Sequence, residues 1–541
     1  MRRNGRVPWT AGGLAVLVIG GVLLAPLYLL IRVGQAGPRA WDVIFEARTF
    51  DLLLGTLLLA AAVTAAAVAI AMPLAWLTTR SDLPWRRFWT VMLALPLLFP
   101  SYVAAYTLVA AVGPRGLLRD ALAPLGVEQL PEVYGFPGAW LVLTLTTYPY
   151  AYLSLRAGLM GLDRSLEEAA RGLGRGPVAA FFMVTLPALR PAIAAGGILI
   201  ALYTLSDFGA VSILRFDSLT SAVFIQYKSS FDRSAAAALA LVLVAVALVV
   251  VLLEGATRGR ARYHTRSRRT RTSTPLGRWR MPAVIFCASV AAVGVVLPLG
   301  VIVTWAARGI VEDAQLRLSG DAVLSSLYAS ALAAAATVAA ALPVAFLAVR
   351  RPGVLSGVLE RATYGGFALP GVTIALSLVF FAANYATPLY QTLALLIFAY
   401  TVRFLPEAVG ASRSALLQVH PNTEEAGRGL GASAAKVFLR ITTPQMLPGI
   451  SAGALLVFLT AMKELPITLL LSPIGFETLA TDIWTATSEA SFARAALPSL
   501  VLVALSAVAV FLMLRAERSS GQHESDERDA LSNVAMEQVP S

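Results

Sequence analysis

The chain has 541 residues, of which 57% are apolar and 14% are charged, and its mean hydropathy is +0.73. Soluble domains average roughly 45–50% apolar and about 25% charged residues, so the composition excludes a soluble globular enzyme and a disordered scaffold. A single cysteine, Cys287, excludes a disulfide framework and a Cys₄ metal site, and three widely separated histidines exclude an imidazole cluster. We therefore expect no metal site, no cofactor and no catalytic centre in this chain.

The formal net charge of +12 arises mainly from arginine, which supplies 40 of the 43 basic residues. These arginines fall in short gaps between long apolar runs. Charge placed in this way is typical of a polytopic membrane protein and does not indicate nucleic-acid binding. The composition therefore predicts a lipid bilayer as the surroundings of the chain and no nucleic-acid partner.

Twelve apolar runs are long enough to cross a membrane, because a hydrocarbon core of about 30 Å needs about 20 helical residues. None of them shows the two-residue alternation of a membrane β-barrel, so we predict an all-α polytopic fold. The first run follows three arginines as a signal peptide would, but it is long and lacks an A-x-A cleavage site, so we interpret it as a retained anchor. The predicted spans are residues 12–31, 52–77, 89–111, 139–157, 192–214, 235–253, 282–306, 322–349, 365–383, 387–408, 449–471 and 494–514.

The distribution of Lys and Arg predicts the orientation of these spans. With the N-terminus in the cytoplasm, the segments on the cytoplasmic side hold 31 basic residues and those on the other side hold 12. Since cytoplasmic loops carry the excess of Lys and Arg, both termini are predicted to be cytoplasmic.

The chain contains an internal repeat. Residues 167–174 (EEAARGLG) match residues 424–431 (EEAGRGLG) without a gap at an offset of 257, and Arg80 matches Arg350 at an offset of 270. Six spans in each half imply parallel repeats related by an axis along the membrane normal. The predicted domains are an N-terminal tail, first span and outer loop (1–51), a first transmembrane domain (52–253), an Arg-rich cytoplasmic linker (254–281), a seventh span with an outer loop (282–320), a second transmembrane domain (321–514) and a disordered cytoplasmic tail (515–541).

Both copies of the repeated stretch lie in cytoplasmic loops that are longer than a membrane turn requires. An S-x-x-E capping box at Ser165 and the matching N-x-x-E at Asn422 predict where a short helix begins, and Gly174 and Gly431 predict where it ends. A single helix of this kind would most simply pack on its own bundle. Two copies in equivalent loops favour docking against a partner that has two equivalent sites.

The E-A-A-x-x-x-G pattern of these loops, followed by x-L-P, resembles the signature of the inner-membrane permease subunits of binding-protein-dependent ABC importers. The resemblance covers about residues 50–253 and 320–514, with Gly427 in place of the second alanine in the second copy. It implies the type I importer permease fold, a bacterial inner-membrane location, two ABC ATPase subunits on the cytoplasmic side and a periplasmic or lipoprotein solute-binding protein. By the same resemblance, coupling to the ATPase involves eight residues, Glu167, Glu168, Ala169, Gly174, Glu424, Glu425, Ala426 and Gly431.

The substrate is indicated by shorter stretches. Residues 206–209 (SDFG), 462–466 (MKELP) and 475–481 (GFETLAT) look most like the ferric-iron uptake group among fused permeases of this length. The resemblance therefore implies ferric iron as the substrate, with thiamine, phosphonate or another small solute as alternatives.

The energy source is expected to lie on another polypeptide. A Walker A motif is absent, because the three lysines, Lys228, Lys436 and Lys463, follow Tyr, Ala and Met rather than the required glycine. The chain is therefore predicted to be a permease subunit and not an enzyme. An ion-coupled secondary transporter is an alternative of a different class, but it would not need the duplicated cytoplasmic helix.

Two carboxylates lie inside predicted spans at positions that the offset of 257 makes equivalent, Asp207 in the fifth span and Glu464 in the eleventh. Charged residues inside a membrane are costly and are functional candidates by default. On a structural interpretation, Glu464 pairs with Lys463 and Asp207 bonds to a neighbouring helix. On a functional interpretation, the two carboxylates are pathway or gate residues that offer oxygen to a hard cation such as Fe³⁺.

Overall fold

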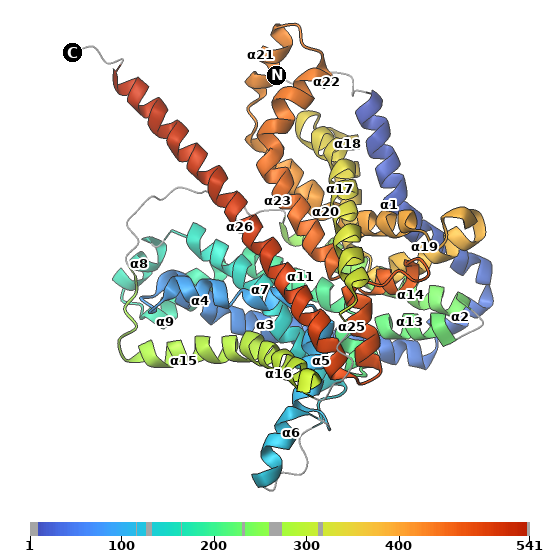
Figure 1. Cartoon of the computed structure of the whole chain (residues 1–541). Coiled ribbons are helices and arrows are strands. Elements are labelled where there is room, and N and C mark those ends of the chain that lie inside the picture. Colours follow the sequence, from blue (N-terminus) through green and yellow to red (C-terminus); the bar gives the residue numbers. More distant parts are fainter. Residues whose placement is uncertain are drawn as a thin grey trace. The chain divides into compact units, whose positions relative to one another are not determined.

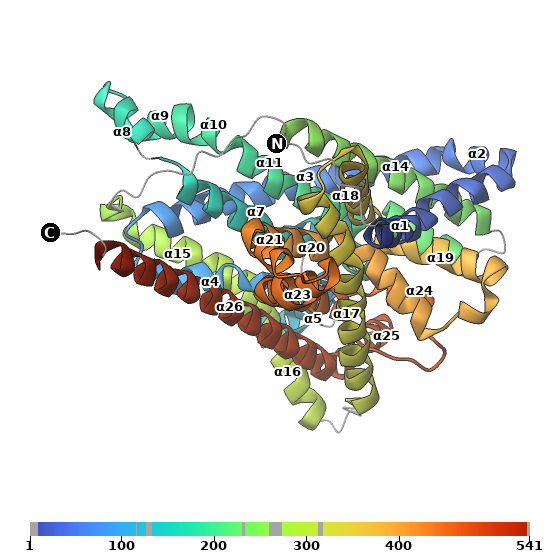
Figure 2. The same ribbon diagram turned by 90° about the horizontal axis from the view of Figure 1, so that it is seen from above.

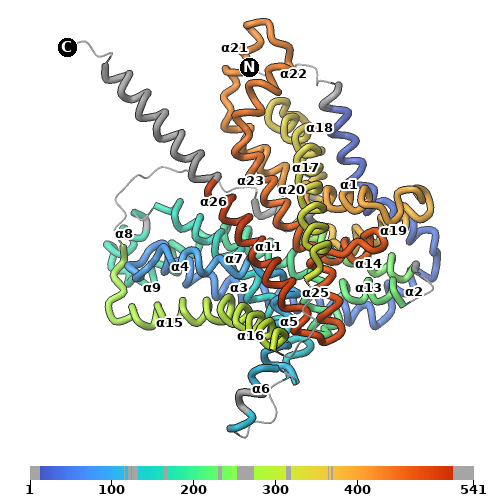
Figure 3. Tube along the Cα trace, in the orientation of Figure 1, coloured from blue at the N-terminus to red at the C-terminus, as the bar shows by residue number. Residues whose placement is uncertain are grey.

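The computed structural model describes residues 9–114, 116–125, 132–163, 165–229, 233–258, 273–311 and 318–537 (Figures 1 and 3). Regular structure in these ranges is helical, apart from one isolated parallel bridge between Ser81 and Thr274. The predicted all-α class is therefore confirmed.

Helices α1 to α14 come from the first half of the chain and α15 to α26 from the second (Figure 1). The first set is α1 (Trp9–Ala36), α2 (Pro38–Ile44), α3 (Ala47–Arg80), α4 (Arg86–Met92), α5 (Ser101–Val112), α6 (Leu117–Leu122), α7 (Phe136–Gly161), α8 (Ser165–Gly172), α9 (Pro177–Ala180), α10 (Leu186–Ala188), α11 (Arg190–Ser206), α12 (Gly209–Ile213), α13 (Leu219–Ser229) and α14 (Arg233–Arg258). The second set is α15 (Arg280–Ala291), α16 (Leu297–Val311), α17 (Gly320–Arg350), α18 (Val354–Ala368), α19 (Gly371–Tyr385), α20 (Leu393–Gln418), α21 (Pro421–Gly429), α22 (Ala434–Val437), α23 (Thr443–Met462), α24 (Pro466–Leu471), α25 (Leu479–Ser488) and α26 (Phe492–Glu537).

Eight helical segments among the described residues are long and apolar enough to cross a membrane, and they coincide with predicted spans one, two, six, seven, eight, ten, eleven and twelve. The third predicted span is a bent pair of helices, at 93°. The fifth begins in the second arm of another pair, Pro177–Ala188 and Arg190–Ser206, which is bent by 65° just before the predicted start of the span. The eight segments are Gly12–Ala36, Ala47–Arg80, Ser234–Leu252, Gly277–Val311, Gly320–Arg350, Leu393–Gln418, Ala434–Met462 and Phe492–Met513. The described residues thus hold eight such helices, or up to ten if each bent pair is one span, against the twelve spans predicted.

Proline explains why the third and ninth predicted spans are not continuous helices. Pro100 precedes α5 with φ −58° and ψ 148°, and Pro370 precedes α19 with φ −57° and ψ 142°. These prolines are equivalent at the offset of 270, and each holds an extended backbone where a helix would otherwise continue. The fourth predicted span is a long helix, α7, which contains several threonines and tyrosines and a central proline and is not among the eight segments.

The chain folds into two compact units that do not follow the boundary between the repeats. We call them the N-terminal unit (Leu29–Arg317 and Ile483–Leu500) and the C-terminal unit (Met1–Tyr28, Leu318–Asp482 and Val501–Ser541). In the C-terminal unit, the Tyr28 hydroxyl of α1 donates to the Phe380 carbonyl oxygen at 3.3 Å, and Ser377 donates to the Ala25 carbonyl oxygen at 2.7 Å. The first helix is therefore part of the packing around the second repeat.

Each unit is built around three helices, and the three in one unit are equivalent in the repeat to the three in the other. In the N-terminal unit α3, α7 and α11 pack together (Figure 2), and in the C-terminal unit the equivalent helices α17, α20 and α23 do so. An equivalent hydrogen bond joins each trio to a later helix, from the Leu219 N–H to Thr56 at 3.0 Å and from the Leu479 N–H to Ser326 at 2.7 Å. The internal repeat is therefore a repeat of tertiary contacts as well as of sequence.

The two polar segments predicted outside the spans are only partly described. Residues 259–272 of the Arg-rich linker lie outside the described residues. Its last part is bonded to the end of α3, because the Thr274 N–H donates to the Arg80 carbonyl at 2.8 Å and the Leu276 N–H to the Asp82 carboxylate at 2.8 Å. The last helix, α26, extends past the predicted twelfth span into the segment for which the sequence predicts disorder.

Candidate functional site

The duplicated cytoplasmic segment forms the same succession of short elements in both halves. The first repeat loop (residues 165–185) consists of α8, α9 and a π-helical turn, Phe181–Thr185. The second repeat loop (residues 421–442) consists of α21, α22 and a π-helical turn, Phe438–Thr442. The two π-helical turns are in register at the offset of 257, so the rare local geometry is repeated together with the sequence.

Both loop helices end as predicted, at glycines in the left-handed conformation. Gly174 has φ +85° and Gly431 has φ +83°. The N–H groups of Gly174 and Arg175 donate to the carbonyls of Arg171 and Ala170, which is the hydrogen-bond pattern of a Schellman motif. Gly431 and Ala432 make the same pair of bonds in the second loop, to the carbonyls of Arg428 and Gly427. Residues with a side chain are strained at such a φ, which explains why glycine stands at both positions.

The helix starts differ from the prediction. Ser165 is the first residue of α8, and its N–H donates to the Asp163 carboxylate at 3.0 Å. In α21 the cap is His420, whose Nδ1 accepts from the Asn422 N–H at 3.3 Å, and Pro421 is the first helical residue. Asn422 therefore lies inside α21, and the capping-box prediction is wrong for the second loop, while residue 164, just before α8, lies outside the described residues. Proline at the first helical position has a suitable φ and no N–H to satisfy, so α21 begins before Asn422.

One face of each loop is exposed to solvent. Leu173 is 85% exposed and Leu430 is 90% exposed, immediately before the two left-handed glycines. Other residues that are exposed at equivalent positions include Glu168 and Glu425, Ala169 and Ala426, Arg171 and Arg428, and Gly174 and Gly431. Each loop thus presents a carboxylate, a small side chain and a leucine, which lets another surface approach closely.

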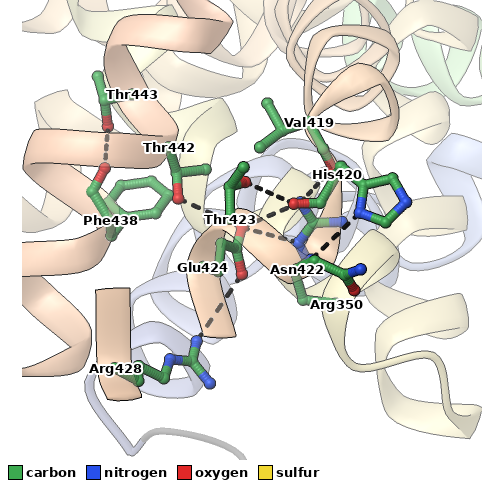
Figure 4. A network of polar contacts seen from close by, with 10 residues as sticks. All are labelled: Arg350, Val419, His420, Asn422, Thr423, Glu424, Arg428, Phe438, Thr442 and Thr443. Atoms are coloured by element: carbon green, nitrogen blue, oxygen red, sulfur yellow. Dashed lines mark hydrogen bonds and ion pairs between the residues drawn. The ribbon is translucent and has the colours of Figure 1, made fainter. Parts of the chain in front are cut away.

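The preceding glutamate of the second loop points inward instead. The Glu424 side chain is 7% exposed and forms an ion pair with Arg350, the last residue of α17, at 2.9 Å (Figure 4). Thr442, the last residue of the π-helical turn, donates to the same carboxylate at 3.2 Å. Arg428 lies 3.8 Å from its other oxygen. Glu424 therefore contacts its own protein on several sides.

The first loop repeats part of this arrangement. Thr185 donates to Glu167 at 3.2 Å, the same distance and the same pair of positions as Thr442 and Glu424. Arg80, equivalent to Arg350, donates to the carbonyls of Leu159 and Leu162 at 2.6 and 2.9 Å. Glu167 is only half-buried. The two loops thus share a threonine contact but differ in how deeply the first glutamate is buried.

Asp207 lies where α11 ends. It is 7% exposed, and its carboxylate accepts from the N–H groups of Ala210 and Val211 at 2.9 and 3.4 Å. Thr220 donates to its backbone carbonyl at 2.6 Å. The fifth predicted span therefore ends as a helix at Asp207, and the carboxylate accepts from the first turn of the short helix α12.

Glu464 follows the end of α23 and repeats this geometry, because its carboxylate accepts from the Ile467 N–H at 3.4 Å. It also lies beside a gap inside the C-terminal unit that is too small for a water molecule and is lined in part by Ser326, Ser330 and Tyr400.

Two charged residues of this region, Arg403 and Glu407, are absent from the sequence-based candidates. Both lie within α20, where Arg403 donates to the Leu369 carbonyl and Glu407 accepts from Thr460 at 3.0 Å. Arg403 and Lys463 are near enough to Glu407 to interact electrostatically with it. The signal was available in the sequence, because both charges fall inside the apolar run 387–408 that we predict to be a span.

Comparison with known proteins assigns the family. The model for the inner membrane component of binding-protein-dependent transport systems matches the chain twice, over residues 67–263 and 338–520. An Fe(3+)-transport system permease protein of Haemophilus influenzae is 35% identical over 92% of this chain and 97% of its own length. A molybdenum transport system permease protein of Escherichia coli is 34% identical over 28% of this chain and 68% of its own, and a sulfate transport system permease protein of the same species is 28% identical over 41% and 82%. The chain therefore belongs to the family of inner membrane components of binding-protein-dependent transport systems, as one polypeptide that contains the component twice.

Proposed function

We propose that this chain is the permease of an ATP-driven importer that carries ferric iron from a solute-binding protein outside the membrane to the cytoplasm by alternating access. The observation that carries the proposal is the similarity to the Fe(3+)-transport permease along nearly the whole of both chains. The molybdenum and sulfate permeases match over less than half of this chain. Thiamine, phosphonate and other small solutes are the alternatives within the same class.

The two repeat loops are the proposed docking sites for two ABC ATPase subunits, one for each loop. The exposed Glu168, Ala169 and Gly174 in the first loop and their equivalents in the second make the contact, with Leu173 and Leu430 beside them. Hydrolysis takes place on these subunits, because the chain has no Walker A sequence. The excess of Lys and Arg places both loops and both termini in the cytoplasm.

Asp207 and Glu464 are the proposed pathway or gate residues. Each is a carboxylate within a predicted span, and each accepts a hydrogen bond from the backbone three residues later. Their negative charge favours a cation over an anion, which agrees with ferric iron and disfavours phosphonate.

The experiment that tests the function is uptake into proteoliposomes that contain the permease with its ATPase and binding protein. We expect uptake of radiolabelled ferric iron that needs ATP inside the vesicles and persists when an ionophore removes the ion gradients. ATP-driven uptake of thiamine or phosphonate instead of iron would contradict the substrate. Uptake that needs an ion gradient and no ATP would overturn the importer class and favour a secondary transporter.

The topology and the stoichiometry have separate tests. A reporter fused after Arg518 should be cytoplasmic, and exposure of the reporter on the outer side would contradict the proposed orientation. The purified complex should contain two ATPase subunits for each permease chain. A complex with one ATPase for each permease would contradict the proposal that each repeat loop is a docking site.

A further inference from the structure

Arg350 connects three parts of the C-terminal unit at one point. It is the last residue of the long helix α17. Its Nη2 lies 2.9 Å from a Glu424 carboxylate oxygen and also donates to the Val419 carbonyl at 2.9 Å, while its Nε donates to Glu424 at 3.0 Å (Figure 4). Val419 directly follows α20, and Glu424 lies in α21. One guanidinium group therefore joins the end of a predicted span to the start of the second repeat loop.

The ion pair is shielded from water. The side chains of Arg350 and Glu424 are 13% and 7% exposed. When a buried carboxylate loses its cationic partner, its negative charge is left without a counter-charge. Removal of one partner from a buried ion pair therefore lowers the stability of the protein strongly, whereas an exposed ion pair contributes little to stability. The planar fork of arginine bonds in two directions at once, which a lysine does not reproduce. The pair therefore restricts both the position and the orientation of α21.

The adjacent glutamate faces the opposite way. Glu425 is exposed, as is Leu430 at the end of the same helix. Successive residues of an α-helix point about 100° apart, so one of two neighbouring glutamates is able to face the protein while the other faces a partner. In the second loop these two tasks are divided between Glu424 and Glu425.

We propose that the Arg350–Glu424 ion pair is an internal latch, which holds α21 on the end of α17 so that movement of the docked ATPase displaces both helices together. Arg350 and Glu424 are positioning residues, and neither contacts the ATPase. This inference rests on the proposed docking function of the second repeat loop. The first loop has its own anchor, in which Arg80 donates to two backbone carbonyls and Thr185 donates to Glu167.

The test uses the reconstituted permease–ATPase complex with the variants Arg350→Met, Glu424→Gln and the charge exchange Arg350→Glu with Glu424→Arg. We expect the ATPase to remain bound to all of them, because the exposed face of α21 is unchanged. Loss of the buried pair should lower the substrate transported per ATP hydrolysed by about tenfold in the single variants, and the charge exchange should restore part of it. Arg350→Lys should be intermediate, since it keeps the charge but not the fork.

Arg413→Met is the matched control, because it removes an ion pair in the same unit, to Glu360 at 3.2 Å, in which the arginine side chain is 46% exposed. It should transport like the original protein. A direct readout comes from spin labels at Asn422 and Val354, both exposed, in a chain whose single Cys287 is replaced by alanine. Their distance distribution should broaden in Arg350→Met and stay narrow in Arg413→Met.

The outcomes separate the latch from the docking function. If Arg350→Met and Glu424→Gln transport normally per ATP while Glu425→Arg loses the ATPase, the latch is wrong and the docking function stands. If Glu425→Arg keeps both the ATPase and transport, the proposed docking function itself fails. If the single variants do not accumulate, the charge exchange provides the comparison, because it keeps an ion pair at the same place. A charge-exchange variant that accumulates with coupling at least partly restored supports the latch, and one that accumulates with no coupling and with broadened distances would overturn it.

Discussion

The two repeat loops have nearly the same backbone but hold their first glutamate to different depths. In both, the first helix ends at a glycine with φ above +80°, and a π-helical turn stands at the same position. Glu424 is buried against Arg350, whereas Glu167 is half-buried and accepts from Thr185. The features that shape the exposed surface are thus repeated, while the contacts that anchor each loop to its own unit have diverged.

The two loops also differ in the size of two side chains that face each other, and the two differences offset one another. Gly427 replaces the alanine found at position 170, and a Cβ added there would lie 2.5 Å from Ile441 Cδ1. The residue of the first loop that corresponds to Ile441 is Val184, which lacks that methyl group. One methyl group is lost at the helix and one is gained opposite it. Close packing therefore accounts for the departure of the second loop from the E-A-A pattern.

The largest effect is expected from reversing the charge of the exposed glutamates in both loops. Glu168→Arg with Glu425→Arg places cations at helix N-termini, where an anion is favoured by about 0.3–1 kcal/mol, and alters the docking surface itself. Transport and co-purification of the ATPase should be lost. If the double variant transports normally with its ATPase bound, the loops are ordinary surface helices.

The next largest effect is expected at the left-handed glycines that end the first helix of both loops. Gly174→Ala and Gly431→Ala force a side chain into the left-handed region at a cost of about 1–2 kcal/mol, so ATPase affinity should fall about tenfold. The loss should be similar in the two loops, because their φ values are +85° and +83°. Gly410→Ala is the control, since a Cβ at that helical position meets nothing within 4 Å. Unequal losses would show that the two loops do not dock in the same way.

A smaller effect is expected at Asp207 and Glu464, and it shows whether these carboxylates act through their negative charge or only as acceptors for backbone N–H groups. Asp207→Asn and Glu464→Gln keep an oxygen that accepts from the backbone but remove the charge, so iron uptake should fall about fivefold at normal protein levels if the carboxylates line the pathway. Asp207→Ala should in addition lose the acceptor for α12, which is worth about 1 kcal/mol in thermal stability. Uptake by the Asn and Gln variants equal to that of the original protein would support the structural interpretation of both carboxylates.

The smallest effect concerns the compensated methyl groups. Gly427→Ala crowds Ile441, whose Cδ1 is the flexible end of its side chain, so the free energy of unfolding should fall by only about 1 kcal/mol. Adding Ile441→Val should restore stability, because the pair then has the residues of the first loop. Thermal unfolding of the purified chain measures both. A double variant no more stable than Gly427→Ala alone would show that the two sites are not coupled.

The sequence alone is sufficient for the class of protein and for much of the site. Apolar runs and the distribution of arginine predict an all-α membrane protein, because the free energy of transferring a helix into lipid depends on its own residues. The repeat and its glycines predict two short helices that end at Gly174 and Gly431, because a left-handed residue is a local requirement. These features depend on neighbours within a few positions of the chain.

Only the tertiary structure shows which of two adjacent residues of the same type is buried and which is exposed. Glu424 and Glu425 have the same side chain, but only Glu424 points inward, because it pairs with Arg350, which lies 74 positions before it in the chain. The packing of the start of α1 around the second repeat likewise had no signal in the sequence. The physical reason is that hydropathy and helix signals report the cost of placing a residue in lipid or in a helix, whereas burial of a particular side chain depends on partners that folding brings from distant parts of the chain.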